Sequence, residues 1–527
     1  MWTIIKADQK NLSILKKEFN FFKSHYFYLI VYLIGVVHWV LFLNYGKIGY
    51  DYEDWSFYFQ LYSTYKESLT RLQIPYHVTF FSGENIDAAS YITQGRFFAS
   101  PWTILSPQIF LLFFIDVKTF ITLQYIFFYS LQFYGILKFK KEFNFSVFAT
   151  VFIIILLSFN GKLLSVSAFG NPQMTFGYML IPLFFWVLYR FLKKNFLTKK
   201  DIIKGALKIA LIFFFILSQT DMHIYYQMSV VAFFIVLFFP NKIFAFISGI
   251  FLSIISSLWY FLPVLLYSRQ TSVVNSYSVD HWRRFGINGY GSQNGVVGKQ
   301  IFEEMYFNIN EFFSFCLNVL KAGINIIGHL YESLVQSFTI IDYNTHDYNL
   351  YISLYGLIVL ILSMSKVKID NFNFLKENYY KIIFSFILIF LISVGPIHKS
   401  IIIFVNKFFL FIPIDAVPSR FMIYVFNFVV LLAGFGFDRL FVKLKSYSVY
   451  AKMLILSSLL IVLFNHSYDW WITNSRKNHL SGGNINELIF YELSGDNQYI
   501  NLVNISYLLT FVFLSLSLWF YYSLKKR

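Results

Sequence analysis

The sequence predicts an all-α, polytopic membrane protein with about twelve transmembrane helices. Of the 527 residues, 57% are hydrophobic and only 13% are charged. A typical soluble domain carries about 25% charged residues, so this chain has too little polar surface to cover a water-soluble globule. The 68 phenylalanines and 39 tyrosines can fill both lipid-facing helix surfaces and the aromatic belts that form at membrane interfaces.

Apolar segments of nearly the length needed to cross a membrane recur along the whole chain. A helix needs about 20 mainly apolar residues to cross roughly 30 Å of hydrocarbon. Twelve segments come near this length, with 225–240 and 451–465 among the shortest; they lie at approximately 26–44, 118–137, 145–164, 174–192, 205–220, 225–240, 243–263, 348–365, 381–396, 421–438, 451–465 and 504–522.

The distribution of cations predicts the orientation of these helices. If the lysine-rich amino terminus lies in the cytoplasm, every even-numbered connection falls on the same side, and most cations lie in those connections, as the positive-inside rule requires. These cations are Lys138, Lys140, Lys141, Arg190, Lys193, Lys194, Lys199, Lys200, Lys242, Lys366, Lys368, Lys376, Arg439, Lys443, Lys445 and Lys525 to Arg527. Both termini are therefore predicted to be cytoplasmic.

Charge and cysteine content exclude other classes. The net charge of +16 does not indicate nucleic-acid binding, because the Lys and Arg residues punctuate apolar segments instead of forming one basic soluble face. Anionic lipid headgroups are the more natural partner of these cations. The single cysteine, Cys316, excludes an intramolecular disulfide and a cysteine-based metal cluster.

Three predicted outer segments, 45–117, 264–347 and 466–503, are too long to be simple turns, and long loops often carry function. In the first segment, Phe57 to Gln73 has an amphipathic helical pattern and is followed by an Ile-Pro-Tyr-His turn that ends at His77. The apolar run from Gln108 to Ile115 is too short to span, so we expect it to lie on the membrane as an interfacial helix.

Three carboxylates follow the first predicted span, at Asp51, Glu53 and Asp54. Acids this close repel one another unless a cation or proton joins them, and a carboxylate with a raised pKa can act as a general base toward a hydroxyl nucleophile. The alternative is that they are solvated acids at the membrane interface. The residues alone favour neither the general base nor the solvated acids.

Cations on the predicted outer side are candidates for holding a phosphate or pyrophosphate. Arg283 and Arg284 adjoin Trp282, so they suit either bidentate phosphate recognition or anchoring at the membrane interface. Arg420 stands at the outer mouth of the tenth predicted span, where the first-turn amides of the helix add to its positive field. A snorkelling arginine would have the same sequence pattern.

Two short outer turns carry clustered polar side chains, Asn171 and Gln173 in one and Asp221 and His223 in the other. Together with Glu53 and His77, they form the predicted substrate-binding set. Asn and Asp also cap helices routinely, and for His223 a structural role is favoured. Asp51, Asp54, Asp221 and His223 have the oxygen and nitrogen donors that would suit Mg²⁺ or Mn²⁺, although no spacing demands a metal.

The order of these features resembles the YfhO-type bacterial membrane proteins and, more widely, the GT-C class of glycosyltransferases. The likeness covers about residues 26–440 and includes the Asp-Trp pair at Asp54, the Gly170–Gln173 turn, the Thr220–His223 turn and the Pro418–Phe421 segment. The family's Gly-His-Pro-Gln turn has Asn171 here in place of histidine. Residues 1–440 would then form the catalytic region, and 441–527 a carboxy-terminal transmembrane hairpin.

This resemblance implies an inverting glycosyltransferase of the bacterial cytoplasmic membrane. It would take a sugar from a polyprenyl-phosphate donor and transfer it to an envelope polysaccharide, lipid or protein on the outer face. The resemblance places the essential acid at Asp54, with Asp51 as the other contender, and makes Arg420 the candidate for meeting the carrier phosphate, with Arg283 or Arg284 assisting.

Three other classes stay open. A transporter shares the twelve-helix layout, but it usually places ionisable residues at mid-membrane depth, and such residues are nearly absent from the predicted spans. An O-antigen polymerase or ligase shares lipid-linked substrates but does not require an early carboxylate. A non-catalytic scaffold of envelope assembly would tolerate loss of all three acids.

Overall fold

The computed structural model describes residues 25–43, 54–78, 95–100, 103–196, 198–267, 352–368, 373–394, 418–477 and 495–526. Over these residues the chain is helical, and its β-type pairing is an isolated antiparallel bridge between His77 and Arg96. The all-α prediction is therefore confirmed for the part of the chain described.

Each of the twelve predicted spans coincides with helix in the structure. The helices are α2 (His25–Phe42), α5 (Val117–Phe143), α6 (Val147–Ser158) with α7 (Gly161–Phe169), α8 (Pro172–Lys193), α9 (Lys199–Gln219), α10 (Met222–Val236), α11 (Pro240–Ser256) with α12 (Leu258–Tyr267), α16 (Ser353–Met364), α17 (Asn373–Val394), α19 (Met422–Phe437), α20 (Ser448–Lys477) and α21 (Asn497–Lys526).

Among the described residues, six helical segments are long and apolar enough to cross a membrane: Val117–Phe143, Val147–Ala168, Pro172–Lys193, Met422–Leu444, Ser448–Asn465 and Asn497–Leu524. The pair α11 and α12, which bends by 73° at its junction, would make a seventh span. The apolar parts of α2, α10 and α16 are shorter than a typical span. The chain is thus a membrane protein by its described helices, and the full number of twelve crossings stays a prediction.

Side-chain caps explain where several of these helices begin. Asp116, Ser146, Asn160, Asn171, Thr198 and Asp221 each accept a hydrogen bond from a backbone N–H of the first turn of the helix that follows. Such a bond satisfies one of the donors that a helix start leaves without a partner. A cap of this kind separates α6 from α7, because Asn160 begins a new helix inside one predicted span.

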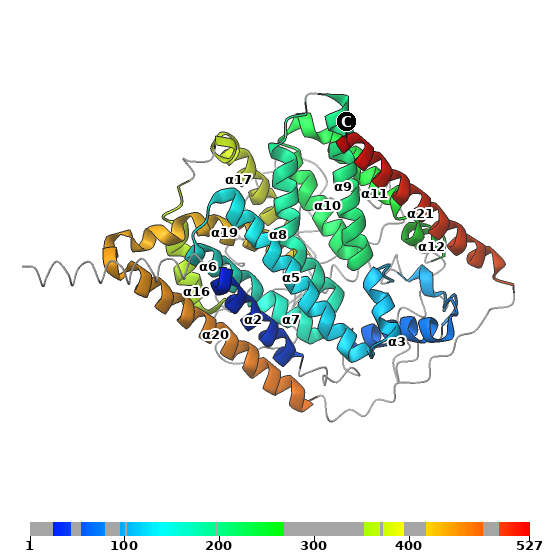
Figure 1. The fold of residues 1–527 in the computed structure, drawn as a ribbon, viewed down its shortest axis with the longest axis horizontal. Coiled ribbons are helices and arrows are strands. Elements are labelled where there is room, and N and C mark those ends of the chain that lie inside the picture. The colour runs from blue at the N-terminus through cyan, green and yellow to red at the C-terminus, as the bar shows by residue number, and fades with distance from the viewer. Residues whose placement is uncertain are drawn as a thin grey trace, which may run out of the picture.

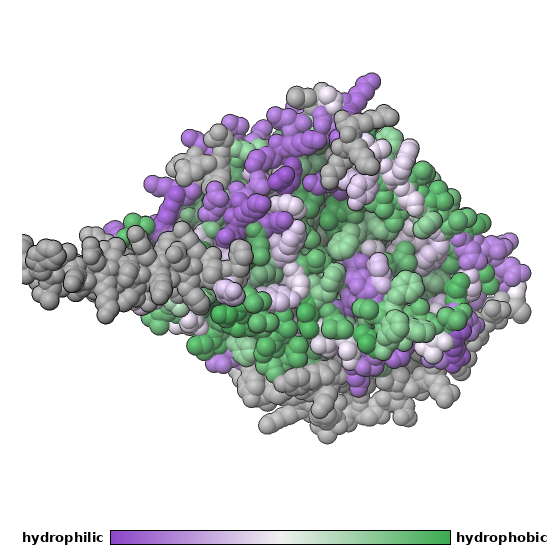
Figure 2. Space-filling model, in the orientation of Figure 1, coloured by the Kyte–Doolittle hydropathy of each residue, from purple (hydrophilic) through white to green (hydrophobic). Residues whose placement is uncertain are grey.

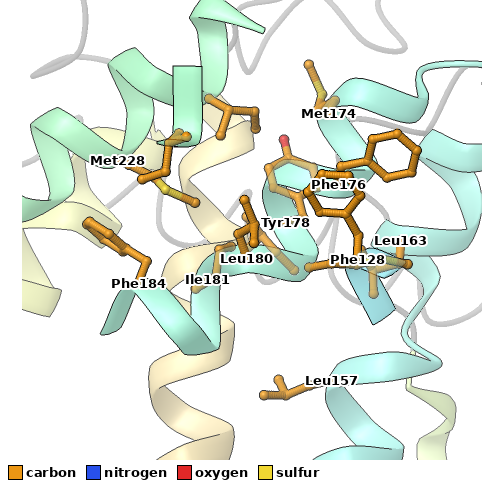
Figure 3. Packing of buried hydrophobic residues seen from close by; sticks show 14 of the residues in the cluster. Phe128, Leu157, Leu163, Met174, Phe176, Tyr178, Leu180, Ile181, Phe184 and Met228 are labelled. Carbon is orange, nitrogen blue, oxygen red and sulfur yellow. The ribbon is translucent and has the colours of Figure 1, made fainter. Parts of the chain in front are cut away.

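The centre of the bundle is the span formed by α6 and α7. Of the Val147–Ala168 window, 94% is buried within the protein, against 17% for Ser448–Asn465 and 22% for Asn497–Leu524. The core is aromatic and aliphatic, with Phe128 stacked on Phe176 at 4.4 Å between α5 and α8. Figure 3 shows this stack beside Leu163 of α7 and Tyr178 of α8.

The two carboxy-terminal helices lie on opposite flanks of the bundle (Figure 1). Helix α20 packs on α6 and α2, whereas α21 packs on α12, α11 and α9. The expected hairpin of residues 441–527 therefore contributes its two helices to different sides of the molecule.

Exposed cations gather where α5 and α8 end and α9 begins. They include Lys141, Arg190, Lys193, Lys194 and Lys199, and we call this the Lys193 end of the bundle. Figure 2 shows hydrophilic side chains at the top of the molecule above a broad hydrophobic band. That arrangement is expected of a helix bundle embedded in lipid.

Candidate functional site

The end of the bundle opposite the Lys193 end is formed by the starts of α8, α10 and α19, and we call it the Asn171 end. Helices α8 and α10 approach closely there, since a Cβ added to Gly177 would lie 2.4 Å from Cγ1 of Ile224. Only glycine allows this approach. It sets the Asn171 turn of α8 beside the Asp221 turn of α10.

The amphipathic helix α3 (Asp54–Arg71) begins against the same turn. Gly170 has φ +100°, a left-handed conformation that favours glycine, and a Cβ on it would stand 2.3 Å from the backbone nitrogen of Trp55. The start of α3, where Asp54 is found, is thus fixed beside Asn171. The side chain of Asp54 lies outside the described part of the structure.

Two tyrosines one turn apart on α3 connect it to α8. The Tyr58 hydroxyl donates to Oδ1 of Asn171 at 3.1 Å, and the Tyr62 hydroxyl is hydrogen-bonded to the Gln173 side chain. Tyr62 is fully buried, and this burial raises its pKa well above the ordinary value. Both polar side chains predicted in the Asn171 turn are therefore held by neutral phenols from α3.

The Asp221 turn is buried and tied to two other elements. The Asp221 side chain is 1% exposed, accepts from the backbone N–H of Ile224 at 3.0 Å, and interacts electrostatically with Tyr260 of α12. Just before the turn, Oε1 of Gln219 accepts from Nε2 of Gln108 at 2.7 Å. His223 follows in the first turn of α10 and is half-buried.

Arg420 belongs to the short 3₁₀ helix η6 (Pro418–Phe421) that leads into α19. Its neighbour Phe421 packs edge-on against Tyr226 of α10 at 6.2 Å, and the Tyr424 hydroxyl donates to Oε1 of Gln227 at 3.3 Å. Arg420 itself is half-buried. These contacts bring the Arg420 segment to the second turn of α10, one turn beyond Asp221 and His223.

A buried lysine that was not among the predicted site residues also lies in this region. Lys162, in the first turn of α7, is 1% exposed, and its Nζ is 5.8 Å from the ring centroid of Tyr178. By the helical rise of about 1.5 Å per residue, its backbone lies roughly 12 Å below Gly170. Its signal in the sequence is a lysine inside an apolar span, directly after the Asn160 cap that breaks the helix.

His77, predicted as a substrate-binding residue, lies in an ion-pair network on the α21 side. Its Nε2 is 2.9 Å from Oδ2 of Asp496, and Nε of Arg96 donates to the same oxygen at 2.8 Å. A second guanidinium nitrogen of Arg96 donates to Oδ1 at 3.3 Å. The guanidinium also lies over the ring of Tyr267, 4.7 Å from its centroid. We call His77, Arg96, Asp496 and Tyr267 the clamp.

The clamp joins segments that are hundreds of residues apart, namely the first long loop, the end of α12 and the start of α21. Burial alone would raise the pKa of Asp496, but the hydrogen bonds from Arg96 and His77 outweigh it and hold the pKa below the ordinary value of 3.8. Asp496 is therefore a carboxylate at neutral pH, and no pattern in the sequence connects it with His77.

The remaining predicted residues, Asp51, Glu53, Arg283 and Arg284, lie outside the described residues. Within the described ranges, no three His, Cys, Asp or Glu side chains come together as a metal site would require. Among the described residues, Asp221 and His223 therefore have no third His, Cys, Asp or Glu side chain with which to form a metal site.

The arrangement at the Asn171 end suits an anionic group. Amides of a helix's first turn carry partial positive charge, and the starts of α8 and α10 lie side by side here, with Arg420 in the segment that contacts the second turn of α10. Phosphates bind readily at such helix starts. Comparison of this chain with protein-family models, with curated proteins and with solved structures found no match.

Proposed function

We propose that this protein is a membrane glycosyltransferase that takes a sugar from a polyprenyl-phosphate donor and transfers it to a cell-envelope acceptor on the outer face of the bacterial cytoplasmic membrane. Support comes from one observation. The start of α3, which bears Asp54, lies against Gly170 just before α8, and the Arg420 segment contacts α10 through Phe421 and Tyr226, while α8 and α10 pack on each other. An acid and a cation from distant parts of the chain thus belong to the same end of the bundle.

In the proposed mechanism, Arg420 and the first-turn amides of α8 and α10 hold the donor phosphate, with Lys162 of α7 adding positive charge. Asp54 accepts the proton of the acceptor hydroxyl. The hydroxyl oxygen attacks the sugar carbon, and the bond between that carbon and the carrier phosphate breaks. The departing phosphate keeps the bonding electron pair. Electrostatic stabilisation of that developing charge is commonly the largest single contribution to such catalysis.

Transfer would be measured with protein reconstituted in liposomes, a panel of polyprenyl-phosphate sugars and a labelled acceptor extract. Asp54→Asn removes the base and should reduce transfer by about 100-fold or more, the typical range for loss of a general base. Glu67→Gln is the matched control, because it removes one negative charge from the exposed end of the same helix. Full activity in Asp54→Asn would overturn the assignment of the base.

The alternative of a multi-helix transporter is favoured by one observation, the buried Lys162. Ionisable groups within spans often mark the substrate or ion pathway of a carrier. A liposome flux assay separates the two functions. A carrier would move substrate across sealed vesicles without forming a transfer product, and Lys162→Met would abolish the flux. A transferase would form product with no net flux. If Asp54→Asn kept both activities, a polymerase, ligase or scaffold role would be favoured instead.

A further inference from the structure

The short 3₁₀ helix η3 (Pro107–Phe113) has two sharply different faces. Ile109 and Leu112 point into the protein and are buried. Four large apolar side chains point outward: Phe110 is 68% exposed, Leu111 44%, Phe113 54% and Phe114 78%. We call these four residues the η3 wedge. Exposed apolar side chains grouped this way mark an interaction surface.

The position of the wedge identifies its partner. Asp116 caps α5, and α5 begins at Val117 as one of the six candidate spans, so the wedge stands at the edge of the membrane region. The exposed residues Leu123 and Phe127 continue the apolar surface along α5. Lys118 is exposed beside it, and Nζ of Lys66 donates to the carbonyl of Ile115 at 3.1 Å. Aromatic side chains flanked by lysines are typical of a lipid interface.

The inner side of this element is bonded to the candidate site. Oε1 of Gln219 accepts from Nε2 of Gln108 at 2.7 Å and from Oγ of Ser106 at 3.2 Å, and Ser106 also donates to Gln108. Gln219 ends α9, and the Asp221 turn follows directly. The same short segment therefore faces outward with apolar side chains and holds the Asp221 turn from within.

We infer that the η3 wedge inserts into the interfacial layer of the lipid bilayer, and that the Gln108–Gln219 contact fixes the Asp221 turn relative to the membrane surface. The wedge thereby sets the depth at which α10 presents its first turn. A lipid-borne ligand arriving along the bilayer would meet that turn at a defined height.

Nitroxide labels test the insertion. In a Cys316→Ser background, Phe110→Cys and Phe113→Cys are labelled and reconstituted in vesicles of phosphatidylcholine and phosphatidylglycerol. Collision rates with oxygen, which concentrates in lipid, and with a water-soluble nickel chelate are then compared. Leu123→Cys on α5 is the lipid reference, and Arg71→Cys at the exposed end of α3 is the water reference.

We expect the oxygen-to-nickel collision ratio at positions 110 and 113 to be several-fold above that at position 71 and close to that at position 123. A ratio equal to that at position 71 would overturn the inference. Exclusion of both reagents together with dipolar broadening would also overturn it, because a second copy of the chain would then cover the wedge.

A second measurement tests the connection to the Asp221 turn. A label at His223→Cys should become more mobile when Gln219→Ala removes the acceptor of both hydrogen bonds, while labels at 110 and 113 keep their collision ratios. An unchanged spectrum at position 223 would refute the coupling. Neither readout uses transfer activity, so these results stand apart from the proposed enzymatic function.

Discussion

Replacing Asp496 by asparagine should open the clamp. The Asp496 and Arg96 side chains are only 12% and 14% exposed, and the carboxylate receives two hydrogen bonds from Arg96 and one from His77. Breaking one partner of a buried ion pair costs about 3–5 kcal/mol. Because the clamp keeps some contact with solvent and asparagine retains one acceptor oxygen, we expect a cost of roughly 3 kcal/mol, at the lower end of that range.

Amide hydrogen exchange reports this opening directly. The backbone N–H of Val78 donates to the carbonyl of Gly95 at 2.9 Å, and that of Phe97 donates to the carbonyl of Tyr76 at 3.0 Å. Both bonds lie beside the clamp and should open with it. At about 1.4 kcal/mol per factor of ten, a loss of roughly 3 kcal/mol predicts exchange of these amides faster by on the order of 100-fold.

The control is Glu67→Gln, which removes a carboxylate from the ion pair with Arg71, whose side chains are 37% and 52% exposed. Exposed pairs contribute about 0–1 kcal/mol, so exchange at Val78 and Phe97 should stay within a few-fold of the unmodified protein. Exchange in Asp496→Asn that matches this control would refute the view that the ion pair, and not the apolar contacts around it, holds the first long loop against α21.

Three further predictions concern the same elements. The folded-state pKa of Asp496 is depressed below 3.8, so the stability that this carboxylate contributes is fully present above that value and is lost as the pH falls through the lower folded pKa. Amide protection of Val78 and Phe97, corrected for intrinsic exchange, should therefore be flat from neutral pH to about pH 5 and fall below pH 4. A loss of protection centred near neutral pH would contradict this. Gly170→Ala should lower the thermal unfolding midpoint more than Gly495→Ala, because both have a left-handed backbone at φ +100° and +104° but only the Cβ at 170 meets the Trp55 backbone; equal shifts would argue against that contact. Tyr58→Phe removes one hydrogen bond to Asn171 and should cost about 1 kcal/mol of unfolding free energy, less than Gly170→Ala.

The helices of this protein were predictable because their cause is local. Apolar runs of membrane-spanning length and the capping residues Asn171 and Asp221 both act within one or two helical turns, and the structure places helices at all twelve predicted segments. The choice between capping and substrate binding could not be made for these two residues from the sequence. In the structure both cap helices; α3 lies against the turn of Asn171, and the Arg420 segment contacts the helix that Asp221 caps.

The clamp and the burial of Lys162 could not be predicted from local sequence patterns. Asp496 and His77 are 419 residues apart, and no periodicity relates residues at that separation. A single lysine barely changes the hydropathy of an apolar segment, so the sequence pattern does not distinguish Lys162. Its importance appears only when Tyr178 and the surrounding helices are seen to bury it.

The sequence alone was enough to predict that this protein lies in a lipid bilayer and where its helices fall. Both features follow from the free energy of placing each short segment in lipid or in water. Tertiary structure decided which helix starts share one end of the bundle, which flanks α20 and α21 occupy, and which charges are paired. These features depend on packing between segments distant in the chain, through close approaches such as Gly177 against Ile224, and each such contact exists only once the other helices are in place.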